Sequence, residues 1–171
     1  MNNHYHSTIT NLPGQVETRE IGPRFASGPL EVNVVFTDPE ATSVALGFAQ
    51  SLALDLGAHI RLRAAVAVPF QLPLDEPPVS LPFFREVLRK LARGLERSTF
   101  QPTIHLYLCR DRVRALSQAL RPNSLVVIGG RKRWWPTAEI RMARALRSEG
   151  HRVIFVDSKA RSALEPLVVA R

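Results

Sequence analysis

The residues best suited to chemistry gather in one stretch, Asn123 to Trp135, which reads NSLVVIGGRKRWW. The run from Leu125 to Ile128 is continuously apolar, which is typical of a strand buried on both faces of a parallel sheet. Gly129 and Gly130 follow it, and three cations come next: Arg131, Lys132 and Arg133. In open α/β sheets, ligands bind beyond the carboxyl ends of the strands. Glycines and cations at such an end predict a site for an anion, first of all a phosphate.

Other residues with chemical potential are isolated in the sequence. Cys109 stands beside Arg110 and Arg112, and neighbouring cations lower a thiol pKa, so a nucleophile is one interpretation. We favour a structural cysteine, because no histidine or acid partner can be identified for it. His4 and His6 could form a metal pair, but no cysteine or carboxylate stands close enough to complete it, so we predict no metal site. No GxxxxGK(S/T), GxGxxG, HExxH, GxSxG or CxxC motif occurs, and no constellation of a base or metal ligands is visible, so we predict a protein that is not an enzyme.

Length and composition indicate a single globular domain. The chain has 171 residues, of which 45% are hydrophobic and 22% are charged. No apolar run approaches the roughly 20 residues that a membrane-spanning helix needs. The first ten residues lack the basic and apolar regions of a secretory signal, and the lone Cys109 cannot form an internal disulfide. Together these features predict a cytoplasmic protein.

The net charge of +8 is unevenly distributed along the chain. Residues 110 to 152 carry eleven Arg or Lys against three acidic residues, which is +8 within that segment alone. Such asymmetry can mark a surface for phosphates, nucleic acid or anionic lipid. It can equally be a solvated face of an arginine-rich protein, since 20 of the 23 cations are arginine. Composition leaves both interpretations open.

The pattern of apolar residues and helix caps predicts alternating strands and helices. Asp38 is expected to cap a helix that starts at Pro39, and five prolines make an irregular loop of residues 69–82. Residues 103–109 alternate in polarity, which suggests a strand near an edge of the sheet. The expected strands are 32–37, 59–68, 103–109, 125–128 and 153–156. The expected helices begin near 39, 81, 113 and 137. Residues 1–29 are predicted to be a disordered tail, 30–157 the α/β domain, and 158–171 a C-terminal extension.

This order predicts a five-stranded parallel sheet with helices on both faces. Over residues 30–157 the chain resembles the universal stress protein family. The resemblance rests on a first strand that ends in Asp38 with Ser43 five residues on, a proline-rich loop after the second strand, and a fourth strand that ends VVIGG. It implies a three-layer α/β/α fold and a non-catalytic regulatory or stress-response function.

The resemblance also implies where an adenine nucleotide, such as ATP, would bind. It places Asp38 beside the adenine and ribose, the backbone near Val68 against the base, and a glycine-rich loop around the phosphates. Gly129 matches the first glycine of that loop, but Lys132 and Met142 stand where two further glycines are expected. Glycine lets the backbone approach a phosphate closely. We therefore expect nucleotide binding to be absent or altered.

Two partner hypotheses follow from the same region. The family resemblance implies a homodimer that pairs through the fifth strand, Val153, Ile154, Phe155 and Val156. The alternative function is binding of nucleic acid or another polyanion by the basic loop 131–135 and the helix after it. In that case the tryptophans would stack on bases while the helix would present Arg141, Arg144 and Arg147. The indoles could instead pack onto the sheet or form a protein interface, and the sequence does not decide between these interpretations.

Overall fold

A computed structural model describes residues 7–12, 16–21, 30–95, 102–131, 134 and 136–159, the first two segments by their backbone alone. Within these residues the strands are β1 (Ser7–Leu12), β2 (Val16–Ile21), β3 (Glu31–Val35), β4 (His59–Ala67), β5 (Thr103–Cys109), β6 (Leu125–Gly130) and β7 (Arg152–Asp157). The helices are α1 (Pro39–Leu56), α2 (Leu81–Arg93), α3 (Arg112–Ala119) and α4 (Ala138–Ser148). None of the helices in the described segments is both long and apolar enough to cross a membrane.

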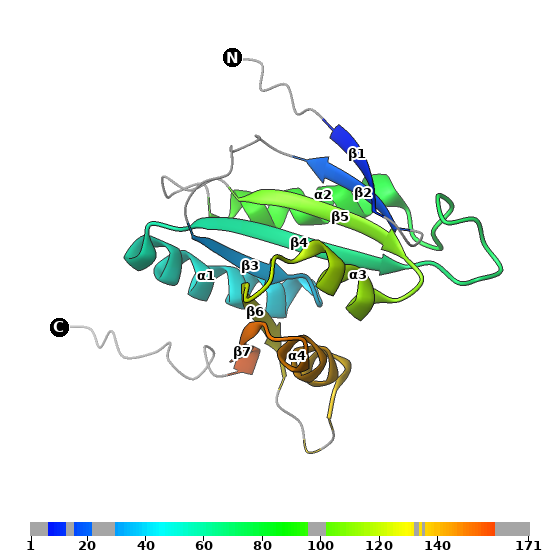
Figure 1. Ribbon diagram of the computed structural model, residues 1–171. Helices are drawn as coiled ribbons and strands as arrows, with labels where there is room; N and C mark the ends of the chain where they lie inside the picture. The colour runs from blue at the N-terminus through cyan, green and yellow to red at the C-terminus, as the bar shows by residue number, and fades with distance from the viewer. Residues whose placement is uncertain are drawn as a thin grey trace, which may run out of the picture.

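The strands form one sheet in the order β1-β2-β5-β4-β3-β6-β7 (Figure 1). Five neighbouring strands run parallel, in the order β5, β4, β3, β6 and β7, which confirms the predicted five-stranded parallel sheet. The chain starts this part of the sheet in its middle, at β3, builds outward to β5, and then returns to the other side of β3 with β6. The strand order therefore reverses between β3 and β6, and such a reversal is where α/β sheets hold their ligands.

A hairpin of β1 and β2 corrects the predicted disordered tail for residues 7–12 and 16–21. The two strands pair antiparallel, and β2 continues antiparallel along β5, with Glu20 opposite His105. The sequence offered a signal for this hairpin, because Pro13-Gly14 is a turn dipeptide between two stretches with β-branched residues. The rest of the predicted tail, and the predicted extension from residue 160 onward, lie outside the described residues.

The pairing with β2 also corrects the prediction for β5. All seven residues of β5 are buried, so it is an interior strand and not one near an edge. Its alternating polarity has a different cause. Ile104, Leu106 and Leu108 face the core under α1 and α2, whereas His105 and Tyr107 belong to the opposite face, which holds a buried polar network.

The helices cover the two faces of the sheet in pairs. The core under α1 and α2 includes Leu46 and Leu88 from these helices and Leu62 and Leu106 from the strands. The core on the other face joins Leu116 of α3 and Leu146 of α4 to strand residues such as Val126 and Ile128. The outer side of α1 also carries large apolar side chains, and Phe48 is 42% exposed there.

Arg63 lies in the polar network of the second face and is only 5% exposed. Its Nε donates to Asn33 Oδ1 at 2.6 Å, and its Nη1 donates to the hydroxyl of Tyr107. Next to it, Arg61 Nη1 lies 3.1 Å from His105 Nε2. Burial, together with the charges of Arg63 and Arg61, lowers the pKa of His105 to about 3. The histidine is therefore neutral, and its Nε2 accepts, because a guanidinium can only donate.

We predict that Tyr107→Phe destabilises the protein by about 1–3 kcal/mol, because it removes an acceptor from a buried guanidinium. Urea unfolding followed by circular dichroism measures this change. The matched variant is the double substitution Arg63→Met/Tyr107→Phe. It should recover part of the loss, because no buried charge then lacks its partner. Equal stability of Tyr107→Phe and the wild type would contradict this role of the hydroxyl.

Candidate functional site at the carboxyl edge of the sheet

The site predicted from the sequence lies where the strand order reverses, at the carboxyl ends of β3 and β6. A hydrogen bond connects these two ends: Thr37 Oγ1 donates to Gly129 O at 2.9 Å. The backbone N–H of Thr37 donates in turn to Thr42 Oγ1 at 3.1 Å. Thr42 belongs to the first turn of α1 and is fully buried. The crevice between the two strand ends is therefore bridged by the protein itself.

Gly129 and Gly130 have structural explanations at this edge. A Cβ on Gly129 would lie 2.0 Å from the backbone oxygen of Ala41 in α1. A Cβ on Gly130 would lie 2.8 Å from Cζ of Phe155 and 3.1 Å from Cβ of Glu139. Gly129 is thus required by the backbone of α1 that packs onto it, whereas at Gly130 the nearest atom is the ring tip of a side chain that can shift. The sequence predicted the two glycines as part of an anion site, and packing accounts for Gly129.

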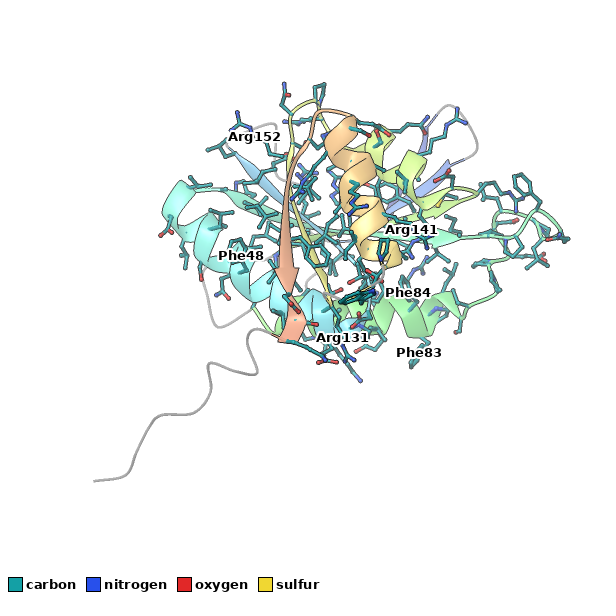
Figure 2. The ribbon with its side chains drawn as sticks, turned by 90° about the horizontal axis from the view of Figure 1, so that it is seen from below. Phe48, Phe83, Phe84, Arg131, Arg141 and Arg152 are labelled. Atoms are coloured by element: carbon teal, nitrogen blue, oxygen red, sulfur yellow. The ribbon has the colours of Figure 1, made fainter. Side chains whose placement is uncertain are left out.

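Asp38 and Arg131 are both near the start of α1. Asp38 Oδ1 accepts from Ala41 N at 2.9 Å, which confirms Asp38 as the predicted helix cap. Arg131 Nη2 forms an ion pair at 2.7 Å with Glu40 Oε2, and both side chains are well exposed. Figure 2 shows Arg131 beyond the carboxyl end of β7. The other two predicted loop cations, Lys132 and Arg133, lie outside the described residues.

Both backbone groups of Val68 are engaged within the protein. Its N–H donates to Cys109 O at 2.8 Å, and its carbonyl accepts from Arg110 Nη1 at 2.9 Å. Arg110 is therefore a central residue of the site, and its part was missed by the sequence analysis. The only signal for it was a cation directly after the end of a buried strand.

Arg110 also holds the start of the proline-rich loop. Besides Val68, its guanidinium donates to the carbonyl of Pro69 and, at 2.9 Å, to that of Leu72. Its Cζ lies 5.2 Å from the ring centroid of Phe70, within the range of a cation–π interaction. The side chain of Arg110, the residue after β5, thus holds the chain where β4 ends. One of its bonds is to Val68 O, part of the backbone that the family resemblance places against the base.

The end of β3 is covered in a similar way. Phe84 of α2 packs edge to face on Phe36 with 5.1 Å between ring centroids, while its neighbour Phe83 is 72% exposed (Figure 2). Arg112 Nη2 donates to Phe36 O at 3.2 Å, and Arg112 Nε is buried with no partner among the described residues. Arg110, Arg112 and Arg131 make the carboxyl edge cationic, and their side chains contact the protein's own backbone or an acid.

Cys109 is not an activated thiol. It is buried, and its Sγ lies 3.5 Å from Val66 O as a weak donor. Burial raises the pKa of Cys109 to about 11, against the opposing effect of the Arg112 charge. Because the thiolate is the nucleophilic form, this cysteine is unreactive at neutral pH. Its surroundings support the structural interpretation made from the sequence.

The predicted basic face lies on α4. Arg141, Arg144 and Arg147 are all exposed, but Arg147 donates from Nη2 to Val153 O at 2.8 Å and so ties α4 to β7. Arg144 and Arg147 line a groove of about 380 Å³ together with Ile140, Ala143 and Phe155. Arg141 lies along α4 in Figure 2. Trp134 is 94% exposed, so its indole does not pack onto the sheet, and Trp135 lies outside the described residues.

The predicted dimer strand forms β7, at the edge of the sheet. Ile154, Phe155 and Val156 are each partly exposed although all three are apolar, and Val153 is buried. His4 and His6, for which the sequence predicted no metal site, lie outside the described residues. Within the described part of the chain, no three His, Cys, Asp or Glu residues come together as a possible metal site.

Solved structures with the same fold are universal stress proteins. A protein from the universal stress protein family of Burkholderia pseudomallei has a TM-score of 0.54 and 23% sequence identity, over 77% of this chain and 98% of that chain. A universal stress protein from Archaeoglobus fulgidus has a TM-score of 0.54 and 14% identity, over 75% of this chain and 93% of that chain. No protein-family model and no curated protein matches the sequence. The chain therefore has a universal stress protein-like fold, as its sequence predicted.

We predict that Gly129→Ala destabilises the protein by at least about 1–3 kcal/mol, because the new methyl group overlaps the backbone of Ala41. Thermal and urea unfolding measure the loss. Gly94→Ala is the matched control, because Gly94 has a right-handed helical conformation at the end of α2 and its new Cβ would lie 3.2 Å from Leu91 O and 4.0 Å from Lys90 O. Comparable stability of the two variants would contradict a packing role for Gly129.

Proposed function

We propose that the protein is a cytoplasmic, non-catalytic regulatory or stress-response protein in which adenine-nucleotide binding is absent or strongly altered. The observation that carries this proposal is the double engagement of Val68. A base that reads the backbone at the end of β4 needs a free N–H or C=O, and here Cys109 O and Arg110 already take both. To bind there, a nucleotide would have to share Val68 O with Arg110 or displace that side chain.

The segment that follows β6 supports the same conclusion. Met142, which stands where a phosphate-binding glycine is expected, is 6% exposed and packs in the core under α4. Lys132 replaces the other expected glycine. A side chain at either position prevents the close backbone approach on which such loops depend. The non-catalytic assignment is supported by the raised pKa of Cys109 and by the engagement of Asp38 and Arg131 in a helix cap and an ion pair.

Isothermal titration calorimetry with Mg-ATP tests the nucleotide proposal. We expect no saturable heat at protein concentrations that detect a dissociation constant of about 1 mM, or −4.1 kcal/mol. A dissociation constant near 1 μM, about −8.2 kcal/mol, would contradict the proposal.

A variant separates the contribution of Arg110 from that of the loop. Adenosine has no phosphates and so does not need the glycine-rich loop. We predict that adenosine binds Arg110→Ala more tightly than the wild type, because Val68 O is then free. Arg114→Ala, an exposed arginine on the neighbouring helix α3, is the control and should behave as the wild type. If Arg110→Ala and Arg114→Ala bind adenosine with the same affinity, Arg110 is not the residue that prevents binding at Val68.

Polyanion binding is a second candidate function, favoured by the exposure of Trp134. An indole that is 94% exposed beside a cationic segment is available to stack on an unpaired base. Arg141 and Arg144, both exposed on α4, would contact the phosphates of a bound strand. Arg147 contributes less to this surface, because it is bonded to Val153 O.

Salt dependence of binding to labelled single-stranded RNA and DNA, followed by fluorescence anisotropy, tests this second function. Five phosphate contacts predict a log–log slope of roughly −3 to −4, and removing either Arg141 or Arg144 should make it shallower by about 0.7. Trp134→Ala should weaken binding without changing the slope, because stacking releases no counterions. Arg114→Ala serves as the control. Absence of binding at low salt would exclude this function.

A homodimer through β7 is the third part of the proposal. The support is an edge strand with apolar, partly exposed side chains, and beside it the exposed ring of Phe48 on α1. Figure 2 shows Phe48 on the helix that lies next to β7.

Ile154→Lys places a charge on this edge and should convert the dimer into monomers, which light scattering detects. The control is Arg141→Lys, which introduces a lysine at an exposed position on α4 and keeps the positive charge there. A wild-type protein that is already monomeric at working concentrations would rule out the dimer.

A further inference from the structure

A second groove lies at the opposite end of the sheet from the candidate site. Its volume is about 590 Å³, and it opens at the amino ends of β3, β6 and β7. Small-molecule sites commonly have volumes of about 300–1,000 Å³. The residues that line the groove include Leu30, Leu56, Glu31, Arg121 and Arg152. Figure 2 shows Arg152 at the end of the molecule opposite Arg131.

One part of the groove is apolar and open to solvent. Leu30, before β3, is 63% exposed, and Leu56, in the last turn of α1, is 43% exposed. Both side chains line the same groove, and Pro122 and Leu125 add further apolar surface to it. Two exposed leucines on one concave surface favour a ligand with an apolar body.

The other part of the groove is positively charged. Glu31 is the only acid among the described residues that line it, and Arg61, which lies outside the groove, pairs with Glu31 at 2.9 Å. Arg121 Nη1 reaches the same Glu31 oxygen at 3.8 Å, so its charge is partly balanced. Arg152 is exposed, and its guanidinium contacts no carboxylate among the described residues. Its backbone N–H donates to Ser124 O at 3.0 Å. About one positive charge in the groove is thus without a counterpart.

We propose that this groove binds an amphipathic monoanion, a carboxylate on an unbranched apolar chain. Arg152 and Arg121 hold the carboxylate, for which the planar guanidinium has matching donors. Leu30 and Leu56 contact the chain. This binding site is independent of the carboxyl edge and goes beyond the function proposed above.

Titration of the ¹⁵N-labelled protein with decanoate below its micelle concentration tests the proposal. Saturable shifts are expected at amides around the groove, including Ser124 and Arg152. Decanol lacks the charge and acetate lacks the chain, so each should bind at least about tenfold more weakly, a difference of about 1.4 kcal/mol.

Two variants test the assigned residues. Arg152→Glu should weaken decanoate binding at least about tenfold, which is about 1.4 kcal/mol, and Leu56→Ser should weaken it to a smaller extent. Arg114→Glu makes the same charge change at an exposed position on α3 and should leave the affinity unaltered. Both groove positions are exposed, and circular dichroism verifies that the variants fold. The proposal is overturned if decanoate does not saturate, if decanol binds as well as decanoate, or if Arg152→Glu and Arg114→Glu have equal affinities.

Discussion

The close approach of α1 to the end of β6 fixes the geometry of the carboxyl edge. Gly129 allows the Ala41 carbonyl to rest on its backbone, and Thr37 then reaches Gly129 O across the point where the strand order reverses. The Asp38 cap starts α1 in the position that this contact requires. A ligand in a crevice at this point would lie against the two strand ends. Here a hydrogen bond joins them.

A second set of contacts closes the neighbouring part of the edge. Arg110 donates hydrogen bonds to the carbonyl groups of Val68, Pro69 and Leu72, and Arg112 donates one to the carbonyl of Phe36. In each case a cation at the end of β5 or the start of α3 satisfies a carbonyl that a strand end would otherwise expose. The positive charge of this segment therefore has a structural role, in addition to any role in binding an anion.

The sequence predicted the parallel sheet well, because buried strands and capped helices leave local patterns. Asp38 with Pro39 marked the start of α1, and the apolar run at Leu125 marked β6. The hairpin of β1 and β2 was missed, since short polar strands carry a weak signal and their pairing with β5 is long-range. The site was predicted less well for the same reason. Whether Gly129 serves a ligand or a helix depends on Ala41, and nothing local to Arg110 indicates the three carbonyl groups it binds.

Native-state hydrogen exchange at Val68 and Thr37 tests most directly the claim that the protein closes its own carboxyl edge. These amides donate to Cys109 O and to Thr42 Oγ1. The account predicts that both exchange almost as slowly as Val34 in the interior of the sheet, and that added ATP changes neither rate. Exchange of Val68 at the rate of an exposed loop, with protection gained on adding ATP, would contradict it and would indicate an open nucleotide site.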